Sequence, residues 1–181
     1  MKMKRVLFLL CMTGFVVCCL LTSCSPVQSY SEIPEIRFKE LVVEDRFDTA
    51  FEQIMRKAIL TFSFIDGDGD LGVRKEDKDN PASRIYYTWF QKLPDMTYDL
   101  YQFNDTLTTI TSAIPYDEVM NKNEAQNKTL KGTIEIVLDP PLKQGLDTMQ
   151  IRFYITDRAK NESNLERTPD FSILNTSVTV K

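Results

Sequence analysis

Short segments in which apolar and polar residues alternate constrain the fold of this chain more than any other feature. In Ile59–Ile65 the apolar residues Leu60, Phe62 and Phe64 fall on one face of an extended strand, and Met149–Ile155 alternates over its whole length. Turn-forming residues separate such segments. Eight strands are predicted, over residues 36–43, 59–65, 84–90, 98–103, 108–114, 133–138, 149–155 and 171–180. Short strands with frequent turns predict an all-β fold, an antiparallel β-sandwich of seven or eight strands.

Residues 48–59 allow two interpretations. Phe51, Ile54, Met55 and Ala58 have the spacing of one helical face, and Asp48 is a suitable helix cap. The same residues can instead extend the strand that follows them. We favour the strand.

The first 24 residues have the layout of a bacterial lipoprotein signal. A basic start at residues 2–5 precedes an apolar run, Val6–Leu21, which is short for a membrane-spanning helix. The run ends in Leu21–Cys24, which resembles a lipobox. That resemblance implies cleavage after Ser23 and lipidation of Cys24, with acyl chains as the membrane anchor. A plain signal peptide or a short anchor helix is the alternative.

This signal divides the chain into three parts. Residues 1–23 form the expected signal peptide, and residues 24–34 contain the lipidated cysteine and a polar tether with two prolines and three serines. Residues 35–181 form a single expected domain. A domain of this size buries enough surface to be stable without disulfides.

The distribution of cysteine, histidine and charge excludes several classes of function. All four cysteines lie within residues 1–24, and the chain has no histidine. Histidine-dependent catalysis and thiolate or imidazole metal sites are therefore excluded in the domain, whereas oxygen-ligated cations such as Ca²⁺ remain. Without residues 1–23 the chain has 19 basic and 26 acidic residues, a net charge of −7. This charge disfavours nucleic acid and anionic lipid as partners.

The most informative motif is the run from Asp66 to Asp70, with glycine at positions 67 and 69, directly after a predicted strand. Alternate aspartates can converge on one hard cation, and the glycines permit a sharp backbone path. Three carboxylates this close repel one another unless a cation neutralises them. We therefore predict that Asp66, Asp68 and Asp70 bind Ca²⁺. An acidic turn without metal and a set of catalytic carboxylates are the competing interpretations.

The motif is not that of an EF-hand. Leu71 stands where the EF-hand loop requires glycine, and a strand rather than a helix enters the loop. We therefore expect a calcium-binding loop of another kind.

A second motif, Asp157–Ser163, follows the strand that alternates most cleanly. It resembles the loop before the last strand of bacterial immunoglobulin-like and fibronectin-III-like domains. Met149–Ile155 resembles immunoglobulin strand F without its tyrosine and cysteine, and Trp89 matches the core tryptophan of strand C. The resemblance implies an Ig-like sandwich that lacks the inter-sheet disulfide. Alternatively, Asp157 and Asn161 only form side-chain-to-backbone bonds in a turn.

The two motifs together predict a geometry. If residues 59–65 are strand B and residues 149–155 are strand F, the B–C and F–G loops lie at the same end of the sandwich. Asp157 would then lie close to the Asp66–Asp70 loop and act as a further metal ligand.

The string Leu60–Gly72, behind a lipobox, resembles a group of Bacteroidetes lipoproteins with no established activity. The resemblance implies an Ig-like extracytoplasmic domain anchored in the outer membrane, facing either the periplasm or the cell surface. Exported proteins of these bacteria carry sugars on Asp-Ser/Thr pairs followed by a small or apolar residue. On this basis Thr49, Thr106 and Thr148 are candidate O-glycosylation sites.

Three functions remain in competition. The first is a non-enzymatic binding or structural module, stabilised by calcium, that contacts a glycan or a protein. The second is an accessory subunit of a surface nutrient-uptake or adhesion complex that pairs through exposed strand edges. The third is a small hydrolase with a carboxylate pair drawn from Asp95, Asp99, Asp117 and Glu118, whose spacing is not distinctive.

Overall fold

The computed structural model describes residues 29–72, 82–101, 109–114, 129–141, 148–174 and 178–181. Strands are the only regular elements in this part of the chain. Their bounds are β1 Glu35–Asp48, β2 Gln53–Asp66, β3 Arg84–Lys92, β4 Tyr98–Leu100, β5 Thr109–Ala113, β6 Leu130–Leu138, β7 Met149–Thr156, β8 Glu166–Arg167 and β9 Val178–Val180.

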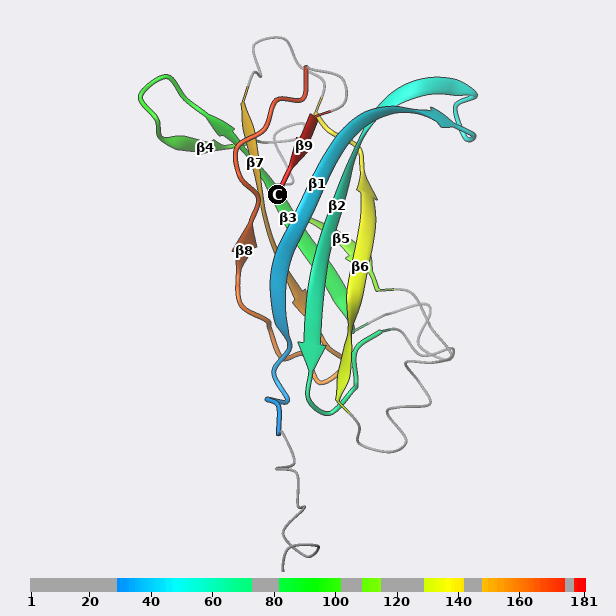
Figure 1. Cartoon of the computed structure of the whole chain (residues 1–181), viewed down its shortest axis with the longest axis vertical. Helices are drawn as coiled ribbons and strands as arrows, with labels where there is room; N and C mark the ends of the chain where they lie inside the picture. The colour runs from blue at the N-terminus through cyan, green and yellow to red at the C-terminus, as the bar shows by residue number, and fades with distance from the viewer. Residues whose placement is uncertain (1–28, 73–81, 102–108, 115–128, 142–147, 175–177) are drawn as a thin grey trace, which may run out of the picture.

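The strands form two antiparallel sheets that pack face to face (Figure 1). The first sheet has the order β6-β2-β1-β9, and the second has the order β4-β3-β7-β8 with β5 also paired to β3. If β1, β2 and β6 are strands A, B and E, and β3, β7 and β8 are strands C, F and G, this is the immunoglobulin arrangement. The expected all-β antiparallel β-sandwich is confirmed and has the strand order of an Ig-like domain, but the described residues form nine strands where seven or eight were expected.

The core consists of the inward-facing residues of both sheets. Leu60, Phe62 and Phe64 of β2 are buried, and so is every second residue of β7 from Met149 to Ile155. The rings of Phe62 and Phe153 lie 5.1 Å apart between the sheets. Trp89 is fully buried on β3 and meets the ring of Phe171 edge-on at 6.0 Å. The period-two alternation therefore places the core as the sequence predicts.

The structure decides between the two interpretations of residues 48–59, and it differs from the predicted strands near the C-terminal end of the chain. Residues 53–59 are strand rather than helix, as favoured, and β2 pairs with β1 along its whole length. The last predicted strand, residues 171–180, is reduced to β9 and an isolated bridge between Phe171 and Met149. The two-residue strand β8 was not predicted, because a segment this short has no periodicity.

The buried residues of the described hydrophobic core lie between Ile36 and Ile173. Every buried residue that the structure describes lies from Pro34 onward, so residues 25–181 contain the whole of this core. Residues 1–28, with the expected signal peptide and Cys24, lie outside the described part. No helix within the described ranges is long and apolar enough to cross a membrane.

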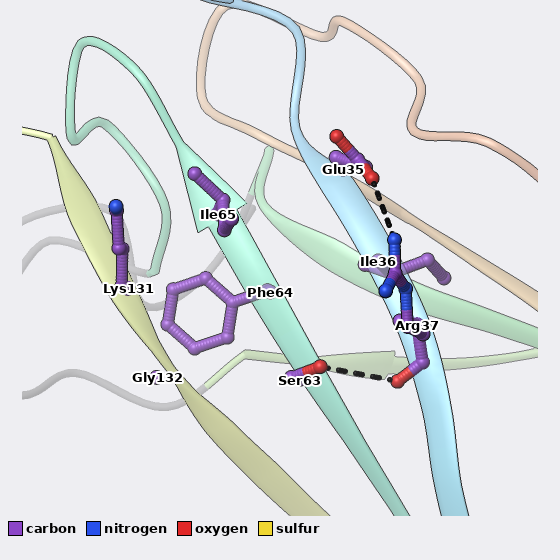
Figure 2. Close-up of a pocket in the computed structure, with 8 residues that line it drawn as sticks. All are labelled: Glu35, Ile36, Arg37, Ser63, Phe64, Ile65, Lys131 and Gly132. Atoms are coloured by element: carbon purple, nitrogen blue, oxygen red, sulfur yellow. Dashed lines mark hydrogen bonds and ion pairs between the residues drawn. The ribbon is translucent and has the colours of Figure 1, made fainter. Parts of the chain in front are cut away.

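A glycine on β6 makes room for a core ring. Gly132 pairs with Phe64 of β2, and the phenyl ring lies over it in Figure 2 beside a cavity of about 300 Å³. A Cβ at Gly132 would approach Phe64 Cε1 to 2.9 Å and Cζ to 3.0 Å.

Gly132→Ala should therefore lower the free energy of unfolding by about 1–3 kcal/mol, because the buried ring has to leave its packed position. Urea unfolding measures this loss. The double variant with Phe64→Leu removes the clashing atoms, so alanine at position 132 should cost clearly less in that background. An equal cost in both backgrounds would contradict the packing explanation.

Candidate metal centre

The candidate centre begins where the core alternation of β2 reaches an aspartate. Residues 60, 62 and 64 face the core, and the same register turns Asp66 inward, where it is fully buried. Burial of an unpaired carboxylate is costly. The end of β2 therefore places a buried carboxyl group at one end of the sandwich.

The loop after β2 folds back over Asp66. The backbone N–H of Leu71 donates to Asp66 Oδ2 at 3.0 Å, and the Leu71 side chain is fully buried. Gly69 and Gly72 have φ values of 74° and 97°, which side-chain-bearing residues rarely adopt. The Gly72 N–H then donates to Ser83 Oγ at 2.9 Å, and Ser83 Oγ donates to the Thr156 carbonyl at 3.0 Å. These bonds fix the loop between strands B, C and F.

Three carboxylates converge inside this loop. One oxygen each from Asp66, Asp68 and Asp70 lies within 4.8 Å of the others. The Oδ1 atoms of all three are buried and have no hydrogen-bond partner within the part of the chain that the structure describes. Since Ca²⁺–oxygen bonds are about 2.3–2.6 Å long, oxygens this far apart can share one ion. The donor set, oxygen only and anionic, suits a hard cation.

The F–G loop lies against the Asp66–Asp70 loop. Figure 1 shows that both loops follow strand ends, those of β7 and β2, at the same end of the sandwich. The Ala159 N–H donates to Asp70 Oδ2 at 3.0 Å, and the Arg158 N–H donates to the Asp70 carbonyl at 3.4 Å. Arg158 Nη1 also donates to the Gly72 carbonyl at 3.2 Å. The expected proximity of the two loops is therefore present.

Asp157 is fully buried beside the three carboxylates but is not one of the converging group. Its Oδ1 accepts a bond from the Asn161 N–H and its Oδ2 from Asn161 Nδ2, both at 2.8 Å. Asp157 thus makes the turn that the alternative interpretation describes. Its charge also acts on the loop, because it contributes to the raised pKa of both Asp66 and Asp70.

Asp66 and Asp70 of this loop have raised pKa values and therefore resist ionisation. Burial, followed by the charges of Asp68 and Asp70, raises the pKa of Asp66 from 3.8 to about 7. Burial, followed by the charges of Asp157 and Asp68, raises the pKa of Asp70 to about 6. A bound dication would offset both causes, since it supplies charge and ligation to oxygens that lack partners.

In the absence of metal, stability should fall as the pH rises from about 4 to about 7. Between the unfolded pKa of 3.8 and the folded pKa of about 7, Asp66 holds a proton only in the folded state. The stability that this proton contributes is complete below pH 3.8 and is lost as the pH rises through 7. Melting in EDTA across this range measures the effect. Asp66→Asn, which cannot titrate, should flatten the profile; an unchanged profile would contradict the assignment.

The loop also touches the segment that leads into β1. The Gly67 N–H donates to the Ser31 carbonyl at 2.9 Å, and Lys131 Nζ lies 3.6 Å from the ring centroid of Tyr30. The end of the expected tether therefore packs beside the Asp66–Asp70 loop.

Those of the other candidate residues that the structure describes lie away from this centre. Thr49 is exposed in the β1–β2 turn, Thr148 is half-buried before β7, and Thr106 lies outside the described residues. Asp95 and Asp99 are exposed on either side of the start of β4, while Asp117 and Glu118 also fall outside the described ranges. Hydrogen bonds from Thr97 hold the pKa of Asp95 below its usual value, which favours a turn-forming carboxylate.

Comparison with protein-family models, curated proteins and solved structures finds no match to the chain.

One supporting residue of the centre, Ser83, was not predicted. Its role depends on the position of β3 beside the end of β7. Local sequence patterns do not predict that position.

Proposed function

We propose that this chain is a lipid-anchored, extracytoplasmic binding or structural module whose Asp66–Asp70 loop is stabilised by Ca²⁺. Two observations carry the calcium part: one oxygen of each of the three carboxylates converges with the others, and each carboxylate has a buried Oδ1 without a hydrogen-bond partner among the described residues. The lipobox-like Leu21–Cys24 supports the anchor and the extracytoplasmic location.

Calcium fits the loop better than magnesium does. Three carboxylates on five consecutive residues make an irregular, strongly anionic oxygen set, and Ca²⁺ accepts six to eight such ligands in variable geometry. Mg²⁺ requires near-octahedral coordination and keeps most of its water. Backbone carbonyls and water would complete the calcium shell, and Asp157 would add negative charge or become a ligand after its turn opens.

A non-enzymatic role fits the chemistry of the loop. Its carboxylates are held together by loop geometry and are oriented toward one another, so their oxygens are available to a cation. A loop that joins strands B and C to the F–G loop is well placed to stiffen this end of the sandwich.

Thermal melting of residues 25–181 in EDTA and in millimolar Ca²⁺ tests the proposal. At 100-fold saturation the ion should stabilise the fold by about 2.7 kcal/mol. Asp68→Ala should abolish the calcium-dependent rise, while Asp99→Ala, an exposed aspartate on β4, should leave it unchanged. Equal melting with and without Ca²⁺ would reduce the loop to an acidic turn.

The structure also favours the second candidate, an accessory subunit of a surface complex, through one feature. The β1–β2 hairpin extends beyond its neighbours in the first sheet, because β6 pairs only with residues 58–66 and β9 only with residues 41–43 (Figure 1). Its tip exposes Phe47, Phe51 and Ile54 by 62%, 66% and 71%. Apolar groups this exposed are typical of a protein contact.

The hairpin tip lies at the opposite end of β1 from Glu35, where the chain arrives from the expected anchor. It would therefore reach a partner away from the membrane. If so, the wild-type protein in detergent extracts of its own membranes should elute in a larger complex than Phe47→Ser/Ile54→Ser does. Elution of both at the size of the free chain would exclude this role.

A further inference from the structure

The outer face of the second sheet carries aromatic and cationic side chains, although strand positions that face solvent are ordinarily polar. Tyr86 of β3 and Tyr154 of β7 are cross-strand partners whose rings stack at 4.7 Å, with an interplanar angle of 5°. Phe90 and Tyr98 lie farther along the same face, each within cation–π distance of Arg152. All four rings are half-buried and therefore partly accessible.

Arg152 is held in a fixed orientation on this face. Its Cζ lies 4.0 Å from the ring centroid of Phe90 and 5.7 Å from that of Tyr98. Its Nε donates to Gln150 Oε1 at 3.1 Å. The rings and the amide orient the guanidinium, and the two Nη atoms retain the fork that binds carboxylates in bidentate geometry.

A second arginine stands directly opposite the first. Arg167 of β8 is the cross-strand partner of Arg152, and like charges in this position destabilise a sheet. Among the described residues no carboxylate forms an ion pair with either guanidinium. The nearby acids are already engaged: Glu166 accepts from the Phe38 N–H and from Asn164 Nδ2, and Asp170 accepts from Lys92 and Tyr98. The partners of Glu166 are neutral, so its charge remains beside the arginines, and the spot carries an excess of one positive charge on an acidic protein.

Two adjoining open depressions lie beside this pair. One, of about 390 Å³, is lined by Arg152, Leu165, Glu166 and Arg167. The other, of about 520 Å³, shares Glu166 and Arg167 with it and adds polar side chains that suit hydroxyl groups, notably Gln150 and Asp170. Both volumes lie in the range of small-molecule sites.

We propose that this face binds an acidic oligosaccharide, with a uronate carboxylate between Arg152 and Arg167. Neighbouring pyranose rings would lie on the aromatic side chains, and their hydroxyl groups would meet Gln150 and Asp170. A sugar satisfies all three features of the face: a flat apolar ring for the aromatics, hydroxyls for the planar polar groups and one carboxylate for the arginine pair. The net charge of −7 without the signal peptide disfavours polyanions with several charges per ring, such as sulfated glycans, so a ligand with no more than one carboxylate per ring fits best.

Calorimetric titration of residues 25–181 with tetragalacturonate and with tetraglucuronate tests the proposal, with maltotetraose as the neutral sugar and tetraglutamate as the acidic peptide. Saturable binding is expected for at least one uronate. It should be at least tenfold tighter than the binding of maltotetraose or tetraglutamate, and it should weaken in high salt. Since the face is separate from the Asp66–Asp70 loop, EDTA should leave the affinity unchanged, which separates this result from the calcium proposal.

Variants of the two arginines test whether uronates bind at this position on the sheet. Arg152→Gln and Arg167→Gln should each weaken uronate binding at least tenfold, whereas Arg46→Gln, an exposed arginine on the hairpin, should not change it. Melting curves verify that each variant is folded. Absence of binding by both uronates at 10 mM, equal binding of the neutral sugar or of the peptide, or an unchanged affinity in Arg152→Gln would each overturn the proposal.

Discussion

Replacement of Trp89 by alanine should lower the free energy of unfolding by about 3–5 kcal/mol, a large part of the stability of a domain this size. Trp89 is fully buried at the centre of β3, pairs with Ile151 of β7 and contacts the ring of Phe171. Its removal leaves a cavity between the sheets that the surrounding strands cannot fill. Unfolding in urea, followed by circular dichroism because Trp89 is the only tryptophan, measures the loss.

The matched variant Trp89→Phe should be much less damaging. The indole Nε1 is buried and has no hydrogen-bond partner among the described residues, so phenylalanine removes a donor that the fold leaves unsatisfied. A loss in Trp89→Ala below about 1 kcal/mol would mean that this position is not part of the core.

The second large effect is expected at Asp68. The difference in stability between Asp68→Asn and the wild type should change sign when Ca²⁺ is added. Without metal, Asp68→Asn should be more stable than the wild type, because the charge of Asp68 contributes to the raised pKa of both Asp66 and Asp70. In saturating Ca²⁺ the order should reverse, because the variant lacks an anionic ligand. The reversal should approach the full stabilisation by calcium, about 2.7 kcal/mol at 100-fold saturation.

Melting temperatures in EDTA and in 10 mM Ca²⁺ measure both halves of this prediction. Asn is nearly isosteric with Asp, so the comparison changes charge with little change of shape. A variant that is less stable than the wild type under both conditions would show that Asp68 has a packing role instead.

The fold could be predicted from the sequence in those strands where apolar, buried residues alternate with polar, exposed ones. The strict period of β2 and β7 placed Phe62 and Phe153 in the core, and the same register explains why Asp66 is buried. The end of the chain was less predictable. The N–H of Ile151 is bonded to the Thr168 side chain, and the segment from Thr168 to Phe171 runs beside β7 with irregular pairing. Bonds of this kind depend on tertiary contacts, which no local pattern encodes.

The candidate centre was predictable in its residues and only partly in its geometry. Alternating aspartates and glycines indicated the triad, and strand order placed the Asp157 loop beside it. The engagement of both Asp157 oxygens by Asn161 depends on the conformation of the turn, including Lys160 at φ 70°. Likewise, Arg152 and Arg167 are 15 positions apart in the sequence, and only the β7–β8 register brings them together.

Calorimetric titration of metal-free residues 25–181 with CaCl₂ at pH 7.5, in parallel with Asp68→Asn, tests the central claim most directly. The proposed site predicts one ion per chain, with an affinity that falls at pH 5.5 as Asp66 and Asp70 take up protons, and with strongly weakened binding in the variant. Saturation at one equivalent in the wild type alone is the expected result. Absence of heat up to 10 mM CaCl₂, or equal binding by Asp68→Asn, would contradict a calcium site in the Asp66–Asp70 loop.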